Sequence, residues 1–299
     1  MLSAKPDWSK ERARWPHADR SQFVKAGGLR WHVQQFGKDE EGEAKPKALM
    51  LHGTGASTHS WRDLVEPLAE TFDVLATDLP GHGFTESPAA SGLALPAMAK
   101  AVATLLQELD HAPDLIVAHS AGAAIALMLA AKHFASPKLI ISFNGALLPF
   151  KGVTQSIFSP LAKLLALNPI IPAIASWRAS DERGVRRLIE KTGSSIDADG
   201  IRLYTRLFSQ SGHVSATLSM MAGWDLRTLH TIWHEVGAHV RLVVTDDDNA
   251  VPAGDADIVA RHLANARVVR LSSGGHLFHE GDPSAATKLI FEAWNDLPG

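Results

Sequence analysis

The segment around Ser120 carries the clearest chemical signal in the sequence. An apolar run at residues 115–117 leads into small-His-Ser-small-Gly, and a helical pattern begins directly after the serine. This order is typical of a strand that turns sharply into a helix and exposes one serine hydroxyl. Ala118 and Gly122 are small because the two backbones nearly touch at such a turn, although glycine is more usual at the first position. Ser120 is therefore the candidate nucleophile, and its alternative role is that of a helix N-cap, which serine also favours.

A serine nucleophile works with a general base and with an acid that orients the base. Asp248 is the candidate acid, since it lies just beyond the expected strand at 240–245. Its spacing to Pro252 fits the Asp-x-x-Val-Pro form that is often found at this turn in enzymes with a serine nucleophile. Asp246 and Asp247 lie one or two residues away and remain the alternatives.

His276 is the candidate base. It follows two glycines just past the expected strand at 266–271, on a loop that can bring the imidazole to Ser120. Its Nδ1–H group would point to Asp248 and its Nε2 atom to the serine hydroxyl, which selects the productive tautomer. His279 is the alternative base.

Backbone amides are the expected donors to a developing oxyanion, because they are rigid and uncharged. One comes from Ala121, directly after the nucleophile and at the start of a helix. The other comes from the glycine-rich loop at 52–55, where we choose Thr54 because the flanking glycines let the backbone approach a substrate.

The side chains that we expect to bind substrate lie beside the turn, near the glycine-rich loop and in the region 149–239. For those in the last region, an equal alternative is that they form its own apolar core. His230 and His234 have a spacing that suits zinc, but no third ligand is evident, so neither a metal site nor a cofactor is expected. The substrate-binding candidates are His119, Trp61, Asn144, Phe150, Met220, Met221 and Trp224.

The elements that position these residues alternate between strand and helix, which predicts an α/β protein with a mostly parallel, doubly wound sheet. After a β-hairpin at 22–35, strands are expected near 48–51, 72–76, 114–118, 138–143, 240–245 and 266–271. Helices are expected at 60–70, 95–109, 121–133, 253–263 and 283–294, and the first twenty residues are expected to be poorly ordered or draped over the core.

Residues 149–239 break this rhythm, because they contain only helical patterns, such as those at 181–191 and 199–208. We interpret this interval as a helical cap inserted after the sixth strand. The expected organisation is a core in two parts, 1–148 and 240–299, separated by a cap at 149–239.

Composition narrows the function. A net charge of −3 gives no electrostatic reason to bind nucleic acid, and the absence of cysteine excludes disulfides, thiolate metal sites and a cysteine nucleophile. The N-terminus lacks the apolar core of a signal peptide, and no run reaches the ~18 apolar residues that cross a bilayer. We therefore expect a cytoplasmic protein without a transmembrane segment. An interfacial contact with a membrane through residues 157–174 remains the alternative.

Four segments together resemble the α/β-hydrolase superfamily across nearly the whole chain. They are HGTGASTHSWRDL (52–64), DLPGHGFT (78–85), AHSAGAAIAL (118–127) and GGHLFHE (274–280). The departures from the usual pattern are small, chiefly Ala118 before the serine and Thr245 where many relatives have glycine. The resemblance implies an α/β-hydrolase fold with a Ser-Asp-His triad at Ser120, Asp248 and His276.

Further segments are similar to the magnesium-chelatase accessory proteins of bacteriochlorophyll biosynthesis. They are NGALLPFKG (144–152), FSPLAKLLALNP (158–169) and LYTRLFSQSGHVSATLSMMAGWDL (203–226). This resemblance implies a role near magnesium insertion into protoporphyrin, a small-molecule substrate such as a tetrapyrrole or its ester, and contact with magnesium chelatase.

These observations lead to one main hypothesis and two alternatives. The main hypothesis is a serine hydrolase that cleaves an ester-like substrate. The alternatives are an accessory protein that binds a tetrapyrrole without catalysis, and a carbon–carbon hydrolase on the same scaffold, because fold and triad do not determine the reaction.

Overall fold

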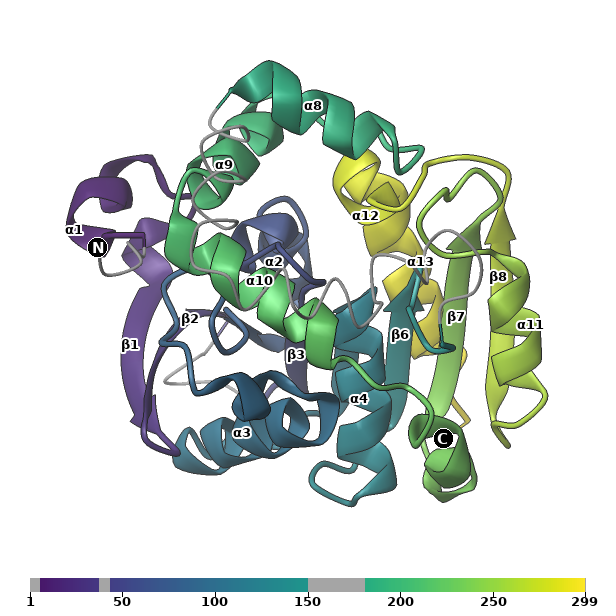
Figure 1. Ribbon diagram of the computed structural model, residues 1–299. Helices are drawn as coiled ribbons and strands as arrows, with labels where there is room; N and C mark the ends of the chain where they lie inside the picture. Colours follow the sequence, from purple (N-terminus) through teal and green to yellow (C-terminus); the bar gives the residue numbers. More distant parts are fainter. Residues whose placement is uncertain (1–5, 38–43, 150–180, 299) are drawn as a thin grey trace.

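A single eight-stranded sheet organises the molecule (Figure 1). The computed structural model describes residues 6–37, 44–149 and 181–298 of the chain. The strand order is β1-β2-β4-β3-β5-β6-β7-β8; β1 and β2 pair antiparallel, and all strands from β4 to β8 in this order pair parallel. The strands are β1 Ser21–Ala26, β2 Leu29–Phe36, β3 Lys47–Leu51, β4 Asp73–Thr77, β5 Leu115–His119, β6 Leu139–Phe143, β7 His239–Thr245 and β8 Ala266–Leu271.

Helices cover both faces of the sheet, as the alternation of strands and helices predicted. On β5, Ile116 and Ala118 face one apolar cluster while Leu115 and Val117 face another, because successive side chains of a strand point to opposite faces. The first face is covered by α3, α4 and α11, and the second by α2 and α13. These helices are α2 Val65–Ala69, α3 Leu95–Glu108, α4 Ala121–Ala131, α11 Gly254–Ala260 and α13 Pro283–Asn295.

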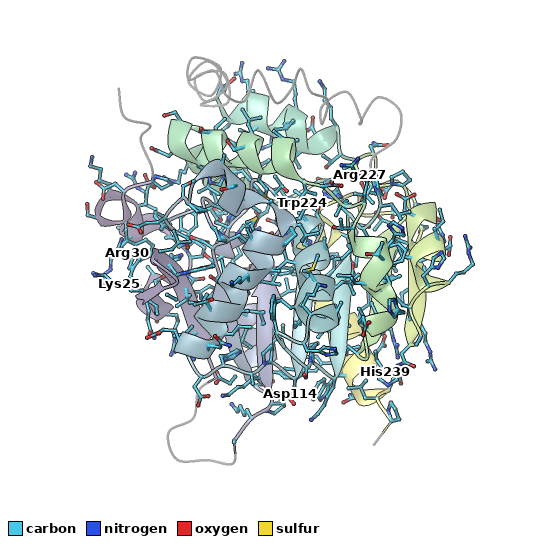
Figure 2. The ribbon with its side chains drawn as sticks, turned by 60° about the horizontal axis from the view of Figure 1, so that its bottom comes forward. Lys25, Arg30, Asp114, Trp224, Arg227 and His239 are labelled. Atoms are coloured by element: carbon cyan, nitrogen blue, oxygen red, sulfur yellow. The ribbon has the colours of Figure 1, made fainter. Side chains whose placement is uncertain are left out.

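The described part of the insertion after β6, residues 181–238, is helical, as expected, and is called the cap below. In Figure 1 its helices α8 and α9 lie at the top, with α12 (Phe278–Gly281) below α8. In Figure 2, Asp114 and His239 mark the opposite end of the sheet, where β5 and β7 begin. The cap helices are α8 Glu182–Glu190, α9 Ala198–Phe208 and α10 Ser211–Gly223, followed by the 3₁₀ turn η5 Leu229–Glu235. The division of the chain at residues 148 and 239 stays a prediction.

An apolar cluster joins the cap to the core. On α9, Ile201 and Tyr204 are spaced so that both lie on one side of the helix. They pack with Ala56, which directly follows the glycine-rich loop, and with Leu277 from the loop after β8. The cap therefore rests directly on the two loops that carry candidate site residues.

The N-terminal arm is draped over the core, which was one of its two expected states. Residues 6–20 form the short helix α1 (Trp8–Glu11) and two 3₁₀ turns. Trp15 is 4% exposed and lies edge-on to Phe84 at 4.7 Å between ring centroids, in a cluster with Leu203 and Leu207 of α9. Glu11 also accepts a hydrogen bond from Arg206 of α9. The arm thus touches the core and the cap together.

The helix expected at 60–70 was wrong in form. The structure has a 3₁₀ turn, η3 (Thr58–Trp61), followed by the shorter helix α2 (Val65–Ala69). Pro67 lies in the first turn of α2, where its missing amide costs nothing, whereas in the interior of a longer helix it would break a hydrogen bond.

Among the described residues, no helix is long and apolar enough to cross a membrane.

Candidate active site

Ser120 lies at the sharp turn between β5 and α4. Its backbone has φ 49° and ψ −116°, a conformation that L-residues rarely adopt and that marks strain. A Cβ atom added at Gly122 would overlap the carbonyl oxygen of Leu51, which explains why this position is glycine. An N-cap serine accepts a hydrogen bond from its helix, but the Ser120 side chain makes no such bond. The hydroxyl is therefore held at the turn without serving the helix.

The glycine-rich loop lies directly against this turn. A Cβ atom added at Gly53 would lie 3.0 Å from Ser120 Cβ and 2.6 Å from His119 Nδ1. The amide of Ala121 begins α4 and so has no acceptor within the helix. Within the described part of the chain, the amide of Thr54 likewise has no hydrogen-bond acceptor. Both amides are thus available to a ligand.

Asp248 and His276 are joined by a hydrogen bond of 2.8 Å between Oδ2 and Nδ1. The carboxylate side chain is fully buried, and the imidazole is 12% exposed. Oδ1 of Asp248 accepts the amides of Ala250 and Val251 at 2.7 and 3.0 Å, which fixes the orientation of the carboxylate. Because the carboxylate accepts, Nδ1 of a neutral His276 carries the proton and Nε2 carries the lone pair.

The third predicted member is not hydrogen-bonded to this pair. Among the residues that the structure describes, the hydroxyl of Ser120 makes no hydrogen bond with His276. The ring of His119, its neighbour in sequence, lies 4.7 Å from the His276 ring between centroids. The structure thus places the serine turn beside the histidine loop.

The three neighbouring aspartates have different surroundings. Asp246 pairs with Arg270 at 2.7 Å at the surface. Asp247 accepts the amides of Gly274 and Gly275 at 3.0 and 2.8 Å. Burial raises the pKa of Asp247, but these two amide bonds, together with hydrogen bonds to its own backbone and to the Thr245 side chain, bring its pKa below the ordinary value. Of the three, Asp248 is the one that faces His276.

His119 and Asn144, expected to contact substrate, are buried and bind the histidine loop. His119 Nε2 donates to the carbonyl oxygen of His276 at 3.0 Å. The Asn144 amide donates to the carbonyls of Gly275 and His276 at 2.9 and 3.1 Å, and its oxygen accepts the amide of Thr245 at 3.1 Å. These contacts position the loop, and a substrate contact by either residue stays a prediction.

The other expected substrate-binding residues are spread more widely. Trp61 has no exposed surface and packs against His279 in the core, which gives it a packing role. Met220 is also fully buried, and its sulfur accepts a hydrogen bond from Thr54 Oγ1 at 3.7 Å, next to the candidate oxyanion loop. Met221 and Trp224 are partly exposed at the end of α10, where Figure 2 shows Trp224. Phe150 lies outside the described residues.

His279, the alternative base, is fully buried behind the site. Its Nε2 atom is 2.9 Å from Ser60 Oγ, and burial lowers its pKa to about 3. A buried imidazole that is bound to a core hydroxyl is poorly placed to exchange protons with a substrate. The geometry therefore favours His276.

A buried polar network joins the core to the cap beside this histidine. Glu280 accepts from Arg62 Nη1 at 3.0 Å on one oxygen, and from Ser60 Oγ and Tyr204 Oη at 2.7 Å on the other. Burial raises the pKa of Glu280, and the Arg62 guanidinium is the largest influence that lowers it. Arg62 also donates to Asp197, which caps α9, at 2.9 Å. The network therefore holds α9 against the core.

Of the buried histidines whose pKa is shifted, six lie near this region and the glycine-rich loop, and a seventh, His111, lies at the opposite end of the sheet, against Ala48 of β3. In each, burial is the main reason why the pKa lies below the ordinary value, because the charged imidazolium loses its hydration. His213 of α10, whose pKa is lowered to about 4, accepts the amide of Gly83 and donates to the carbonyl of Gly55. The seven are His52, His59, His82, His111, His119, His213 and His279.

Because these histidines have lowered pKa values in the folded protein, we expect acid to destabilise the fold. As pH falls below ~6.5 they gain protons in the unfolded chain before they do so in the folded protein, so the free energy of unfolding falls as pH falls. Each contributes up to ~1.4 kcal/mol per pH unit, and for His213 this window extends down to about pH 4. Urea unfolding between pH 7.5 and 5 measures the slope, and His213→Gln should make it smaller. A free energy of unfolding that does not vary with pH over this range would contradict the prediction.

Comparison with known proteins identifies the family. Residues 48–288 match the model of the "Alpha/beta hydrolase family". The chain belongs to this family. Like this chain, an α/β-hydrolase fold protein from Burkholderia ambifaria has the same overall fold, with a TM-score of 0.76 at 20% identity over 92% of this chain and 98% of its own.

Two curated relatives match this chain over most of their own length. The magnesium-chelatase 30 kDa subunit of Rhodobacter capsulatus is 36% identical over 94% of this chain and 96% of its own. The pimeloyl-[acyl-carrier protein] methyl ester esterase of Neisseria meningitidis is 28% identical over 78% of this chain and 88% of its own. The fold therefore occurs in a relative named for a chelatase and in a relative named for an esterase.

Sequence reasoning missed several residues that hold the histidine loop in place. Thr245, noted only as a departure from glycine, donates its hydroxyl to the carbonyl of Gly275 at 3.0 Å. Asp247 was considered only as an alternative acid, and Ser194 of the cap was not considered. The signal that could have found them is the Gly274-Gly275 pair, because two adjacent glycines mark a backbone that other segments approach closely.

Proposed function

We propose that this protein is a serine hydrolase that acts on an ester-like carbonyl. Ser120 attacks the carbonyl carbon while His276 takes the hydroxyl proton, and Asp248 holds the imidazole in the required tautomer. The amides of Thr54 and Ala121 stabilise the negative charge on the former carbonyl oxygen. His276 returns its proton to the leaving alcohol, then activates the water that releases the acid from the acyl-enzyme.

The observation that carries this proposal is the 2.8 Å bond between Asp248 and His276 on the loops after β7 and β8. Two further features support it: the strained backbone of Ser120 and the two amides beside it, for which the described part of the chain supplies no acceptor. The relative named as a methyl ester esterase makes an ester the substrate class to test first.

An active-site-directed fluorophosphonate tests the proposal, because it forms a covalent bond with an activated serine. We expect stoichiometric labelling of the wild-type protein and none of Ser120→Ala. Ser209→Ala, which removes an exposed hydroxyl on the cap, is the matched control and should label normally. Labelling that survives in Ser120→Ala would refute the assignment of the nucleophile.

Gly53→Ala is expected to slow this labelling by about 100-fold. The added Cβ would lie too close to both Ser120 Cβ and His119 Nδ1, so the serine or the oxyanion loop must shift. Gly254→Ala is the control, since a Cβ atom there would meet nothing within 4 Å. Equal labelling rates in the two variants would show that the close approach of Gly53 has no part in reactivity.

A second candidate function is favoured by the 36% identity to the magnesium-chelatase 30 kDa subunit. We infer from it an accessory protein that binds a tetrapyrrole, associates with magnesium chelatase and does not use Ser120 for catalysis. Titration with protoporphyrin, followed by the Soret band and tryptophan fluorescence, tests this candidate. Binding that is unchanged in Ser120→Ala, together with no turnover of esters, would select it over the hydrolase; the absence of any spectral change would reject it.

A further inference from the structure

The loop between α8 and α9 touches both loops that carry the candidate base and acid. The carbonyl oxygen of Thr192 accepts the amide of His276 at 3.2 Å and the amide of Asn249 at 3.2 Å. Asn249 directly follows Asp248 in the sequence. One carbonyl of the cap therefore joins the backbone of the base to the backbone beside the acid.

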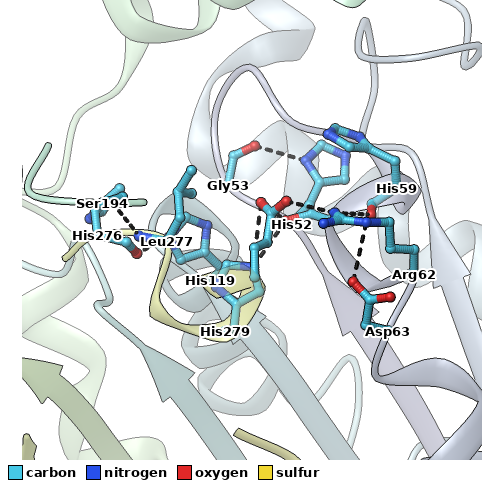
Figure 3. Close-up of polar contacts among 12 residues, drawn as sticks. His52, Gly53, His59, Arg62, Asp63, His119, Ser194, His276, Leu277 and His279 are labelled. Atoms are coloured by element: carbon cyan, nitrogen blue, oxygen red, sulfur yellow. Dashed lines mark hydrogen bonds and ion pairs between the residues drawn. The ribbon is translucent and has the colours of Figure 1, made fainter. Parts of the chain in front are cut away.

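A second contact from the same loop is made by Ser194, which is 3% exposed (Figure 3). Its Oγ atom accepts the amide of Leu277 at 2.8 Å. Thr192 Oγ1 donates to the carbonyl of Ile189 at 2.6 Å, so in the 2.8 Å contact between the two hydroxyls Ser194 is the donor. The resulting chain of hydrogen bonds runs from the residue after His276 to the last turn of α8.

Backbone packing leaves no space between the two loops. A Cβ atom added at Gly275 would overlap the carbonyl group of Gly193, and one added at Gly193 would overlap the carbonyl oxygen of Asp247. Both glycines also have positive φ, +64° and +82°, which L side chains rarely adopt. The cap loop therefore fits the acid and base loops backbone to backbone.

The histidine loop is held by different partners on its two sides. Its amides at His276 and Leu277 are bound by the cap, through Thr192 and Ser194. Its carbonyl at His276 is bound by the core, through His119 and Asn144. The orientation of the imidazole thus depends on the cap and the core together.

We propose that Ser194 is a positioning residue, which acts through the backbone of Leu277 to aim His276 at Ser120. The proposal rests on the serine hydrolase function proposed above. The cap then contributes to the geometry of the reactive groups. If the cap loop moves away from the histidine loop, the amides of His276 and Leu277 lose their acceptors and the imidazole is no longer held toward Ser120. Contact of the cap loop with the histidine loop and activation of the serine are then coupled.

Ser194→Ala tests this proposal, because it leaves the buried amide of Leu277 without an acceptor. We expect the maximal rate of fluorophosphonate labelling to fall about tenfold while the apparent binding constant of the probe stays unchanged. Ser194→Thr keeps the hydroxyl and should restore most of the rate, and Ser209→Ala serves again as the control. Thr192→Val, which removes the hydroxyl that orients Ser194, should give a smaller loss in the same direction and decides the question if Ser194→Ala does not fold.

A second readout separates this proposal from the proposed function. The proton on His276 Nδ1, bound to a buried carboxylate, gives a downfield proton NMR signal that can be assigned with ¹⁵N-labelled histidine and His276→Gln. We expect Ser194→Ala to shift or broaden this signal and Ser194→Thr to restore it. Wild-type protein that is not labelled would refute the hydrolase, while the NMR signal would still test the positioning of His276. A labelling rate and a signal in Ser194→Ala that both match the wild type would overturn the role of Ser194.

Discussion

Asp248→Asn is expected to lower the rate of Ser120 labelling by about 10³–10⁴-fold while the protein stays folded. Oδ1 of Asp248 accepts the amides of Ala250 and Val251, so the oxygen of an asparagine takes that place and its NH₂ group faces His276. His276 Nδ1 must then accept a hydrogen bond, and the ring proton moves to Nε2. An imidazole in this tautomer cannot take the serine proton.

Asp246→Asn is the matched control for this change. Asp246 pairs with Arg270 at the surface, so its replacement should alter the labelling rate by less than about twofold. Rates are compared by fluorophosphonate labelling, and the tautomer of His276 is determined from the ¹⁵N shifts of the ring. A rate for Asp248→Asn within tenfold of the wild type would remove Asp248 from the site and direct attention to Asp247.

Arg62→Leu is expected to lower the free energy of unfolding by about 3–5 kcal/mol. Among the described residues, the change leaves the Glu280 carboxylate fully buried with the hydroxyls of Ser60 and Tyr204 as its remaining donors. Burial then raises the pKa of Glu280 further, since the largest opposing influence is gone. A carboxyl whose pKa is raised in the folded state destabilises the fold increasingly as pH rises through that pKa. The loss of unfolding free energy in Arg62→Leu should therefore be smaller in acid.

The double variant Arg62→Leu/Glu280→Gln is the control, because it leaves no unpaired buried charge at Glu280. Urea unfolding should find it more stable than Arg62→Leu alone, since removing both partners is less costly than removing one. If the double variant is as unstable as the sum of the two single changes, the ion pair does not account for the effect of Arg62.

The sequence was most informative where one local pattern decides the structure. The apolar runs and the small residues around Ser120 predicted the strand, the turn and the helix, because sheet burial and backbone contact allow few residue types there. The family, predicted from the resemblance of four segments, and the helical insertion after β6, predicted from helical patterns, are confirmed. The helix expected at 60–70 failed because the position of Pro67 was not taken into account.

Contacts between distant segments could not be predicted in this way. His119 directly precedes the serine and Asn144 directly follows β6, but their hydrogen-bond partners are carbonyls more than a hundred residues away. Ser194 and Thr192 have no local pattern that marks them, since their role depends on backbone groups of another loop. The choice among the three aspartates rested on one residue of register, and only the folded loop shows that Asp248 alone of them faces His276.

The N-terminal arm has a consequence for the order of folding. Glu11 and Arg206 are separated by 195 positions in the chain, and Trp15 packs with two leucines of α9. Such contacts close a very long loop, so their entropic cost is met only after the segments between them have folded. The contacts between the arm and α9 are therefore expected to form late in folding, after α9 has packed on the core.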